Sequence, residues 1–131
     1  MARDETSGGV NMKVELSKEY RFEAAHQLPA TPEWHKCHRL HGHSYRVALS
    51  VVGEVDPATG WLIDFGRIDE LFAPLFKRLD HHCLNDVPGL ENPTSESFAA
   101  WLWRELRPQL PELTAVTVWE THDARCTYRG E

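Results

Sequence analysis

The clearest pattern along the chain is an alternation of apolar and polar residues that predicts β-strands. In residues 43–55, HSYRVALSVVGEV, every second position is apolar: Tyr45, Val47, Leu49 and Val51. Successive side chains of a strand point to opposite faces, so this stretch predicts a strand with one apolar face. Residues 13–26, KVELSKEYRFEAAH, alternate less regularly and predict a second strand.

Helical spacing replaces this alternation in two later stretches. Asp64 is a typical N-cap residue, and apolar residues recur after it at intervals of three and four: Ile68, Leu71, Phe72, Leu75 and Leu79. Pro74 lies inside that pattern and predicts a kink. Thr94 or Ser95 can cap a second helix, which ends at Pro108. Its apolar face would consist of Phe98, Trp101, Leu102 and Leu106.

Turn and strand patterns complete the predicted fold. The turn-forming residues 56–60, DPATG, predict a hairpin that returns through residues 61–65, WLIDF. Residues 113–121, LTAVTVWET, and 125–129, RCTYR, predict two closing strands. Strands, two helices and further strands in this order indicate the α+β class, with both helices covering one face of an antiparallel sheet.

Length and composition fit one domain. The chain has 131 residues; residues 1–11 are polar and Gly-rich, so we predict a disordered N-terminal lead and a single domain over residues 12–131. The net charge of -6 argues against nucleic acid as a partner. No apolar run approaches the roughly 20 residues that cross a bilayer. Three cysteines without a signal-peptide pattern favour a reducing, cytoplasmic setting.

Histidine is the unusual component, because seven of the eight histidines lie between residues 23 and 82. His41 and His43 are separated by one residue at the entry to a predicted strand, so their rings project from the same face. If the preceding strand pairs antiparallel, His26 at its end can meet them. Three neutral nitrogen ligands with an open fourth position are typical of catalytic zinc. A lone histidine is more often a hydrogen-bonded surface residue, but this spacing favours metal.

Cys37, four residues before His41, allows two interpretations. As a fourth ligand beside the three histidines, its thiolate would complete a structural zinc site. A domain of this size folds unaided, however, and C-x3-H-x-H lacks the paired short spacings of structural sites. The flanking Lys36, His38 and Arg39 favour a thiolate that acts as nucleophile or proton acceptor. An incidental loop thiol is the simpler alternative.

Two acidic residues are further candidates. Asp80 stands next to His81 and can orient its imidazole if a turn brings both side chains together; the alternative is a helix end where the histidine complements the dipole. Glu120 continues the apolar row of Val116 and Val118, so its carboxylate is predicted to point inward, where burial favours a ligand-binding role. A solvent-exposed strand end is the alternative for Glu120.

These motifs resemble those of the 6-pyruvoyl-tetrahydropterin synthase-like family. The resemblance covers residues 12–131 and rests on six stretches: FEAAHQLP, HKCHRLHGHSY, GEVDPATGWLIDF, RLDHHCLND, GLENPTSE and ETHDARCTYRGE. Together they are highly specific for the family.

The resemblance implies a role for each candidate residue. The family's zinc ligands correspond to His26, His41 and His43, and its catalytic thiol, a proton acceptor, corresponds to Cys37. Its catalytic Asp-His pair corresponds to Asp80 and His81. Glu120 matches the glutamate that anchors the pterin ring. Thr94, Ser95 and Glu96 match neighbouring residues of the family that also help to bind the pterin ring.

The resemblance also implies the T-fold, in which a four-stranded antiparallel sheet and two helices per subunit build an oligomeric barrel. Subunits would form trimers and a homohexamer, with active sites between subunits. The implied substrate is 7,8-dihydroneopterin triphosphate. With Zn2+ as cofactor, it would become 6-carboxy-5,6,7,8-tetrahydropterin in the queuosine pathway, releasing acetaldehyde and triphosphate.

Two details concern the branch of the family. Pyruvoyl-forming members resemble C-x5-HGH, whereas this chain has C-x3-HGH starting at Cys37, which favours the carboxy-forming branch. His38 departs from the small residue that is more usual after the cysteine and would offer an unwanted ligand. Formation of 6-pyruvoyl-tetrahydropterin, and a non-catalytic zinc- or pterin-binding module, remain as alternatives.

Overall fold

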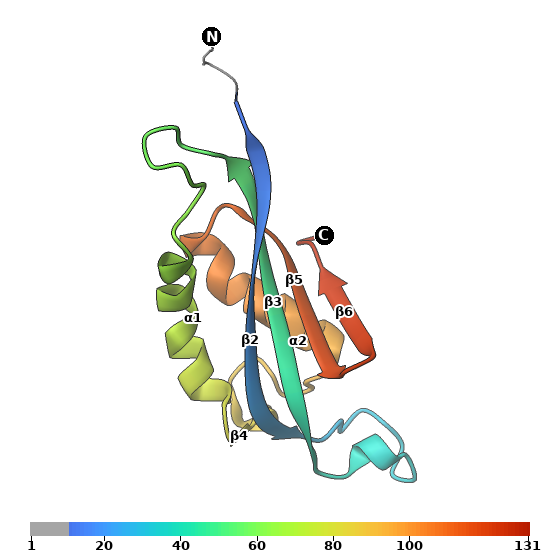
Figure 1. Ribbon diagram of the computed structural model, residues 1–131. Coiled ribbons are helices and arrows are strands. Elements are labelled where there is room, and N and C mark those ends of the chain that lie inside the picture. The colour runs from blue at the N-terminus through green and yellow to red at the C-terminus, as the bar shows by residue number, and fades with distance from the viewer. Residues whose placement is uncertain (1–10) are drawn as a thin grey trace.

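The computed structural model describes residues 11–131, which form a twisted five-stranded sheet with two helices on one face (Figure 1). The strand order is β4-β2-β3-β5-β6. The strands are β2 (Lys13–His26), β3 (His41–Glu54), β4 (His82–Cys83), β5 (Leu113–Thr121) and β6 (Ala124–Tyr128). The helices are α1 (Phe65–Leu79) and α2 (Ser95–Leu106). The predicted α+β class is confirmed.

The sheet differs from the predicted one in having a fifth, parallel strand. β4 pairs with β2 through Ala24↔His82 and Ala25↔Cys83, whereas the other three pairings are antiparallel. A strand of two residues has no alternation by which a sequence pattern can be recognised. β4 matters here because it fixes the segment after α1 to the edge of β2.

The predicted return strand through residues 61–65 is wrong. Only an isolated bridge joins Asp56 to Trp61, after a turn in which Gly60 has a positive φ of 84°. Leu62 then packs against Gly53, where an added Cβ would lie 2.6 Å from the Leu62 side chain. The segment therefore crosses the end of the sheet to reach α1 and does not extend the sheet.

Both helices begin where the capping residues predict. The Asp64 carboxylate accepts a hydrogen bond from the Gly66 amide at 3.0 Å, and the Thr94 hydroxyl accepts one from the Ser97 amide at 3.0 Å. α1 continues through Pro74, which lies on its exposed side, where water can satisfy the carbonyl that lacks an amide partner. α2 ends at Leu106, and a 3-10 turn over Arg107–Gln109 follows.

The core lies between the sheet and the helices. Its fully buried side chains come from both strands and helices and include Leu49, Val116, Ile68, Phe72, Phe98 and Leu102. In β2 and β3 the register pairs Phe22 with Tyr45 and His26 with His41, so these four residues share the helix-covered face. The opposite face is open over the described residues and carries polar side chains.

Residues 1–10, and with them nearly all of the predicted N-terminal lead, lie outside the described residues. Across residues 11–131 no helix is both long and apolar enough to pass through a membrane.

A core substitution in α2 tests the packing of the helices on the sheet. Leu102 is 0% exposed, so Leu102→Ala leaves a cavity and is expected to lower the free energy of unfolding by about 2–5 kcal/mol. Arg104→Ala, on the exposed side of the same helix, is the matched control, and we expect a change within about 0.5 kcal/mol. Urea denaturation at one protein concentration measures both. Equal stability of the two variants would contradict the described core.

Candidate metal centre and active site

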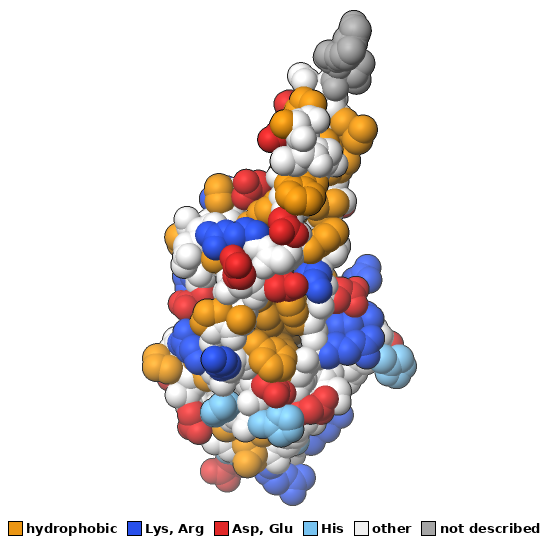
Figure 2. All heavy atoms as spheres, turned by 60° about the vertical axis from the view of Figure 1, so that its left-hand side comes forward, with side chains coloured by type: hydrophobic (Ala, Val, Ile, Leu, Met, Phe, Trp, Pro, Cys, Tyr) orange, Lys and Arg blue, Asp and Glu red, His pale blue; other side chains and the backbone are white. Residues whose placement is uncertain are grey.

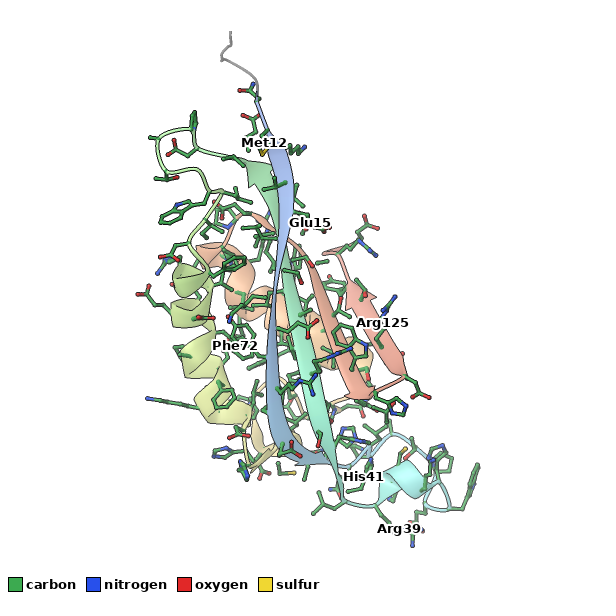
Figure 3. The ribbon with its side chains drawn as sticks, in the orientation of Figure 1. Met12, Glu15, Arg39, His41, Phe72 and Arg125 are labelled. Carbon is green, nitrogen blue, oxygen red and sulfur yellow. The ribbon has the colours of Figure 1, made fainter. Side chains whose placement is uncertain are left out.

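Three histidines meet at the end of the sheet that is farthest from Met12 (Figure 3). His26 ends β2, and His41 and His43 begin β3; the antiparallel register places His26 opposite His41 and Ala24 opposite His43. One nitrogen from each ring lies within 4.8 Å of the other two. The ring centroids are 4.6 to 5.0 Å apart. The predicted convergence of three imidazoles is confirmed.

Backbone carbonyls fix the orientation of two of these rings. His26 Nδ1 lies 3.0 Å from the Pro93 carbonyl oxygen, and His41 Nδ1 lies 2.7 Å from the Arg39 carbonyl oxygen. A carbonyl can only accept, so each Nδ1 carries the proton and each Nε2 carries a lone pair. The two Nε2 atoms face each other at 3.0 Å. A shared cation relieves this opposition of lone pairs, and the group therefore fits a metal ion.

Burial favours the neutral form of two of the three histidines, and a metal ligand must be neutral. His26 is 1% exposed, and burial lowers its pKa. Burial also lowers the pKa of His43. Tyr45 lies beneath the cluster, with its hydroxyl 3.0 Å from His26 Nδ1, and its ring contacts Phe22 and Phe98 in the core. The histidine cluster is thus built directly on the hydrophobic core.

Glu120 lies beside the histidine cluster, on the side of β5 to which its position in the strand pattern assigns it. Its carboxylate is 3.9 Å from His43 Nε2, and the side chain is 26% exposed. The pairing of β5 with β6 is irregular between Trp119 and Thr121, so Glu120 occupies a bulge. A bulge can redirect a side chain out of the regular alternation. Glu120 follows the buried Val118 and closes the apolar row at the cluster.

Within the described residues, the group that can hold a metal consists of three histidines, and Cys37 does not belong to it. It belongs to a 3-10 turn over Lys36–His38, where its amide donates to His35 Nδ1 at 3.0 Å and its carbonyl accepts from the Leu28 amide at 2.8 Å. His38 lies outside the histidine cluster as well, and its Nδ1, 2.9 Å from the Thr31 carbonyl oxygen, ties the loop together. Cys37 is a half-buried free thiol.

Asp80 and His81 form the predicted pair. His81 has a φ of 59°, the only positive value at a non-glycine position among the described residues, and this turn brings its Nδ1 to 3.0 Å from the Asp80 carboxylate. The Glu23 backbone holds the pair on β2, because its amide donates to Asp80 at 3.0 Å and its carbonyl accepts from the His81 amide. The Glu23 amide, and then the His81 ring, lower the pKa of Asp80.

A pocket of about 500 Å³ connects this pair to the metal cluster. It is lined by Glu23, Ala24, Ala25, Gly42, His43, Ser44, His81, His82 and Cys83. Glu23 and Ser44 belong to the pocket but not to the predicted site, and the Ser44 hydroxyl donates to Glu23 at 2.7 Å. Only the cross-strand register, which pairs these two residues, could have revealed them.

The segment Thr94–Glu96 lies at the start of α2, directly after the carbonyl that holds His26. The Thr94 hydroxyl caps the helix, so it already accepts a hydrogen bond from the Ser97 amide.

The structure brings His81, which is paired with Asp80, and Glu120 to the histidine cluster. Among the described residues Cys37 shares no hydrogen bond with Asp80 or His81, and it does not line the pocket that contains His81.

Comparison with known proteins gives consistent results. A profile of the family 6-pyruvoyl tetrahydropterin synthase matches residues 15–131. A 6-carboxy-5,6,7,8-tetrahydropterin synthase of Synechocystis sp. is 44% identical over 119 residues, covering 86% of this chain and 91% of that protein. A dihydroneopterin monophosphate aldolase of Pyrococcus furiosus is 31% identical over 115 residues, covering 86% and 94%. The solved structure of Caenorhabditis elegans 6-pyruvoyl tetrahydropterin synthase has a TM-score of 0.85 at 27% identity, covering 92% and 97%.

The sheet, its two helices and the histidines at its end define the class of the protein, which is a T-fold enzyme with a candidate metal centre. The chain belongs to the 6-pyruvoyl tetrahydropterin synthase family, and it is a lyase that processes pterins.

Metal analysis tests the histidine cluster. We expect His41→Ala to lower the affinity for zinc by more than about 100-fold, because replacing even a partner of a ligating histidine costs about 10- to 100-fold. Cys37→Ala and His38→Ala, the controls, should bind zinc like the wild type, since neither side chain belongs to the cluster. Competition with a chromogenic chelator measures the affinities.

Circular dichroism before and after chelation completes this test. The fold rests on a buried apolar core, so the far-ultraviolet spectrum should not change when zinc is removed. Unfolding on chelation, together with loss of zinc from Cys37→Ala, would contradict the catalytic interpretation and support a structural zinc site.

Proposed function

We propose that this protein is a zinc-dependent carbon-carbon lyase that converts 7,8-dihydroneopterin triphosphate and one water to 6-carboxy-5,6,7,8-tetrahydropterin, releasing acetaldehyde and triphosphate. The observation that carries the proposal is the pair of opposed Nε2 lone pairs of His26 and His41, with Glu120 and His81 beside the same cluster. The similarity to the 6-carboxy-5,6,7,8-tetrahydropterin synthase of Synechocystis sp. and the C-x3-HGH spacing support the carboxy-forming reaction. The corresponding pathway is queuosine biosynthesis.

The metal would be held by His26, His41 and His43. When bound, zinc supplies a Lewis acid that favours the ionised form of a substrate hydroxyl. Glu120 anchors the pterin, because a carboxylate accepts hydrogen bonds from the amino group and the N–H edge of the ring. Thr94, Ser95 and Glu96 contribute beside it from the start of α2.

Two groups of the chain move protons. Cys37, acting as a thiolate, takes a proton from a carbon of the substrate's side chain. His81 exchanges protons on the other side of the site, where Asp80 stabilises the charged imidazolium at 3.0 Å. Negative charge develops on the substrate oxygen, where a bound metal would stabilise it, and on the departing triphosphate.

We further propose a cytoplasmic homohexamer, a dimer of trimers, with active sites between subunits. The separation of Cys37 from the His81 pocket within one chain supports this assembly. Within residues 11–131, most of the outer edge of β2 and the outer edge of β6 pair with no other strand, which agrees with this assembly because exposed strand edges pair readily with another chain.

Product analysis tests the reaction. Zinc-loaded wild type incubated with 7,8-dihydroneopterin triphosphate should release acetaldehyde and triphosphate, detected by mass spectrometry. Cys37→Ala and His81→Gln should each lower kcat by about 10²–10⁴-fold, because each removes a proton-transfer group. Cys126→Ala, a thiol in β6 outside the pockets of the site, is the matched control and should keep wild-type kcat. A 6-pyruvoyl product without acetaldehyde would favour the pyruvoyl-forming alternative, and no turnover with bound zinc would favour a non-catalytic module.

Subunit mixing tests the location of the active site. Cys37→Ala and His81→Gln chains, each inactive alone, are refolded together and assayed. If the thiol and the imidazole come from different subunits, about a quarter of the sites in a random mixture carry both intact groups, and activity returns. If both groups come from one chain, the mixture stays inactive. Size-exclusion chromatography with light scattering checks that mixed oligomers form.

A further inference from the structure

The open face of the sheet carries two arginines side by side, near the end of the sheet where the three histidines meet. Arg21 of β2 pairs directly with Arg46 of β3 in the antiparallel register. Like charges directly opposite on neighbouring strands destabilise a sheet. Glu19 offers Arg46 only a distant partner at 3.9 Å, and within residues 11–131 no carboxylate lies within 4.0 Å of Arg21. Within the described residues, Arg21 has no ion-pair partner to offset this repulsion.

Trp119 orients one of the two guanidinium groups. Arg46 and Trp119 are cross-strand partners of β3 and β5, and the guanidinium lies 3.9 Å above the centroid of the indole ring. Stacking engages the flat face of the guanidinium and leaves its N–H edges free to donate. Arg46 is therefore held ready for an acceptor with several oxygens, and loses little side-chain entropy on binding it.

Both arginines line a pocket that also reaches the proposed site. The pocket has a volume of about 450 Å³ and is lined by Arg21, Gly42, His43, Ser44, Arg46, Trp119, Glu120, Thr121 and His122. Gly42, His43 and Ser44 line both this pocket and the pocket of His81, so the two pockets adjoin at the histidine cluster. The cations thus share one hollow with the proposed pterin anchor, Glu120.

We propose that Arg21 and Arg46 bind the triphosphate group of the substrate and stabilise it as it leaves. This proposal rests on the proposed function, since it takes the triphosphate ester as the ligand. Phosphate oxygens accept two parallel hydrogen bonds from a guanidinium, and two adjacent guanidinium groups suit a chain of phosphates. When the carbon–oxygen bond to triphosphate breaks, the electron pair stays on the departing oxygen, and the arginines stabilise that added negative charge. Glu120 and the arginine pair would then hold opposite ends of one substrate.

Binding of two fluorescent probes tests this subsite without turnover. Neopterin triphosphate and neopterin, which lacks the phosphates, are titrated against zinc-loaded protein by fluorescence anisotropy at fixed ionic strength. Arg21→Gln and Arg46→Gln should each raise the Kd of neopterin triphosphate on the order of tenfold or more, through lost charge-assisted hydrogen bonds. Both should leave the Kd of neopterin within about twofold of wild type, since the pterin contacts are unchanged.

Arg129→Gln is the matched control, because Arg129 lies near the same open face but lines a different hollow. It should leave both Kd values unchanged. The subsite is wrong if the arginine variants bind neopterin triphosphate like the wild type, if they weaken both probes equally, or if wild type does not prefer the triphosphate probe. The absence of acetaldehyde from wild type, by contrast, refutes the proposed reaction while the ratio of the two Kd values still decides the subsite.

Discussion

The pairing of β2 with β3 is the constraint on which the site depends. Its register sets His26 opposite His41 and keeps His43 on the same face, above Tyr45. A slip of one residue would turn every side chain of one strand to the other face, separate the histidines and remove the apolar row from the core. The energy that specifies the register comes from burial of residues such as Phe22 and Leu49, which have no part in the chemistry. Core packing thereby determines how the three histidines are arranged.

The helices contribute to the same site through backbone atoms. The chain enters α2 through Pro93, whose carbonyl holds the His26 ring, and it leaves α1 through Asp80 and His81, which are fixed to the Glu23 backbone. Backbone partners of this kind are set by the fold and not by side-chain rotamers, so they orient the ring with little entropy cost. In Figure 1 α1 lies beside β2 and α2 lies behind the sheet, and the segment that joins the two helices passes through β4 near the lower end of β2. In Figure 2, the visible histidines lie in the lower half of the molecule, away from the projecting end of β2.

Periodicity predicted the parts of the structure that depend on local sequence. The β3 alternation, the N-caps Asp64 and Thr94, and the shared face of His41 and His43 follow from residue spacing alone. The parts that were missed depend on contacts between distant segments. β4 exists because two residues meet β2, and residues 61–65 leave the sheet because Leu62 packs on Gly53. The individual catalytic and pterin-binding roles remain predictions, since no ligand contact tests them.

The two faces of the sheet meet chemically only at its end. Along the middle of a regular strand, residues of one face are buried against the helices and those of the other face lie open, so a pocket reaches both faces only near the strand ends, as the pocket of His81 does, or at a bulge. At the bulge of β5 the alternation breaks, and the consecutive residues Trp119, Glu120 and Thr121 all line one pocket. Gly42, without a side chain, lies between the histidines in the same hollow. The bulge thus places Glu120, beside the histidines built on the core, in the same hollow as the arginine pair of the open face.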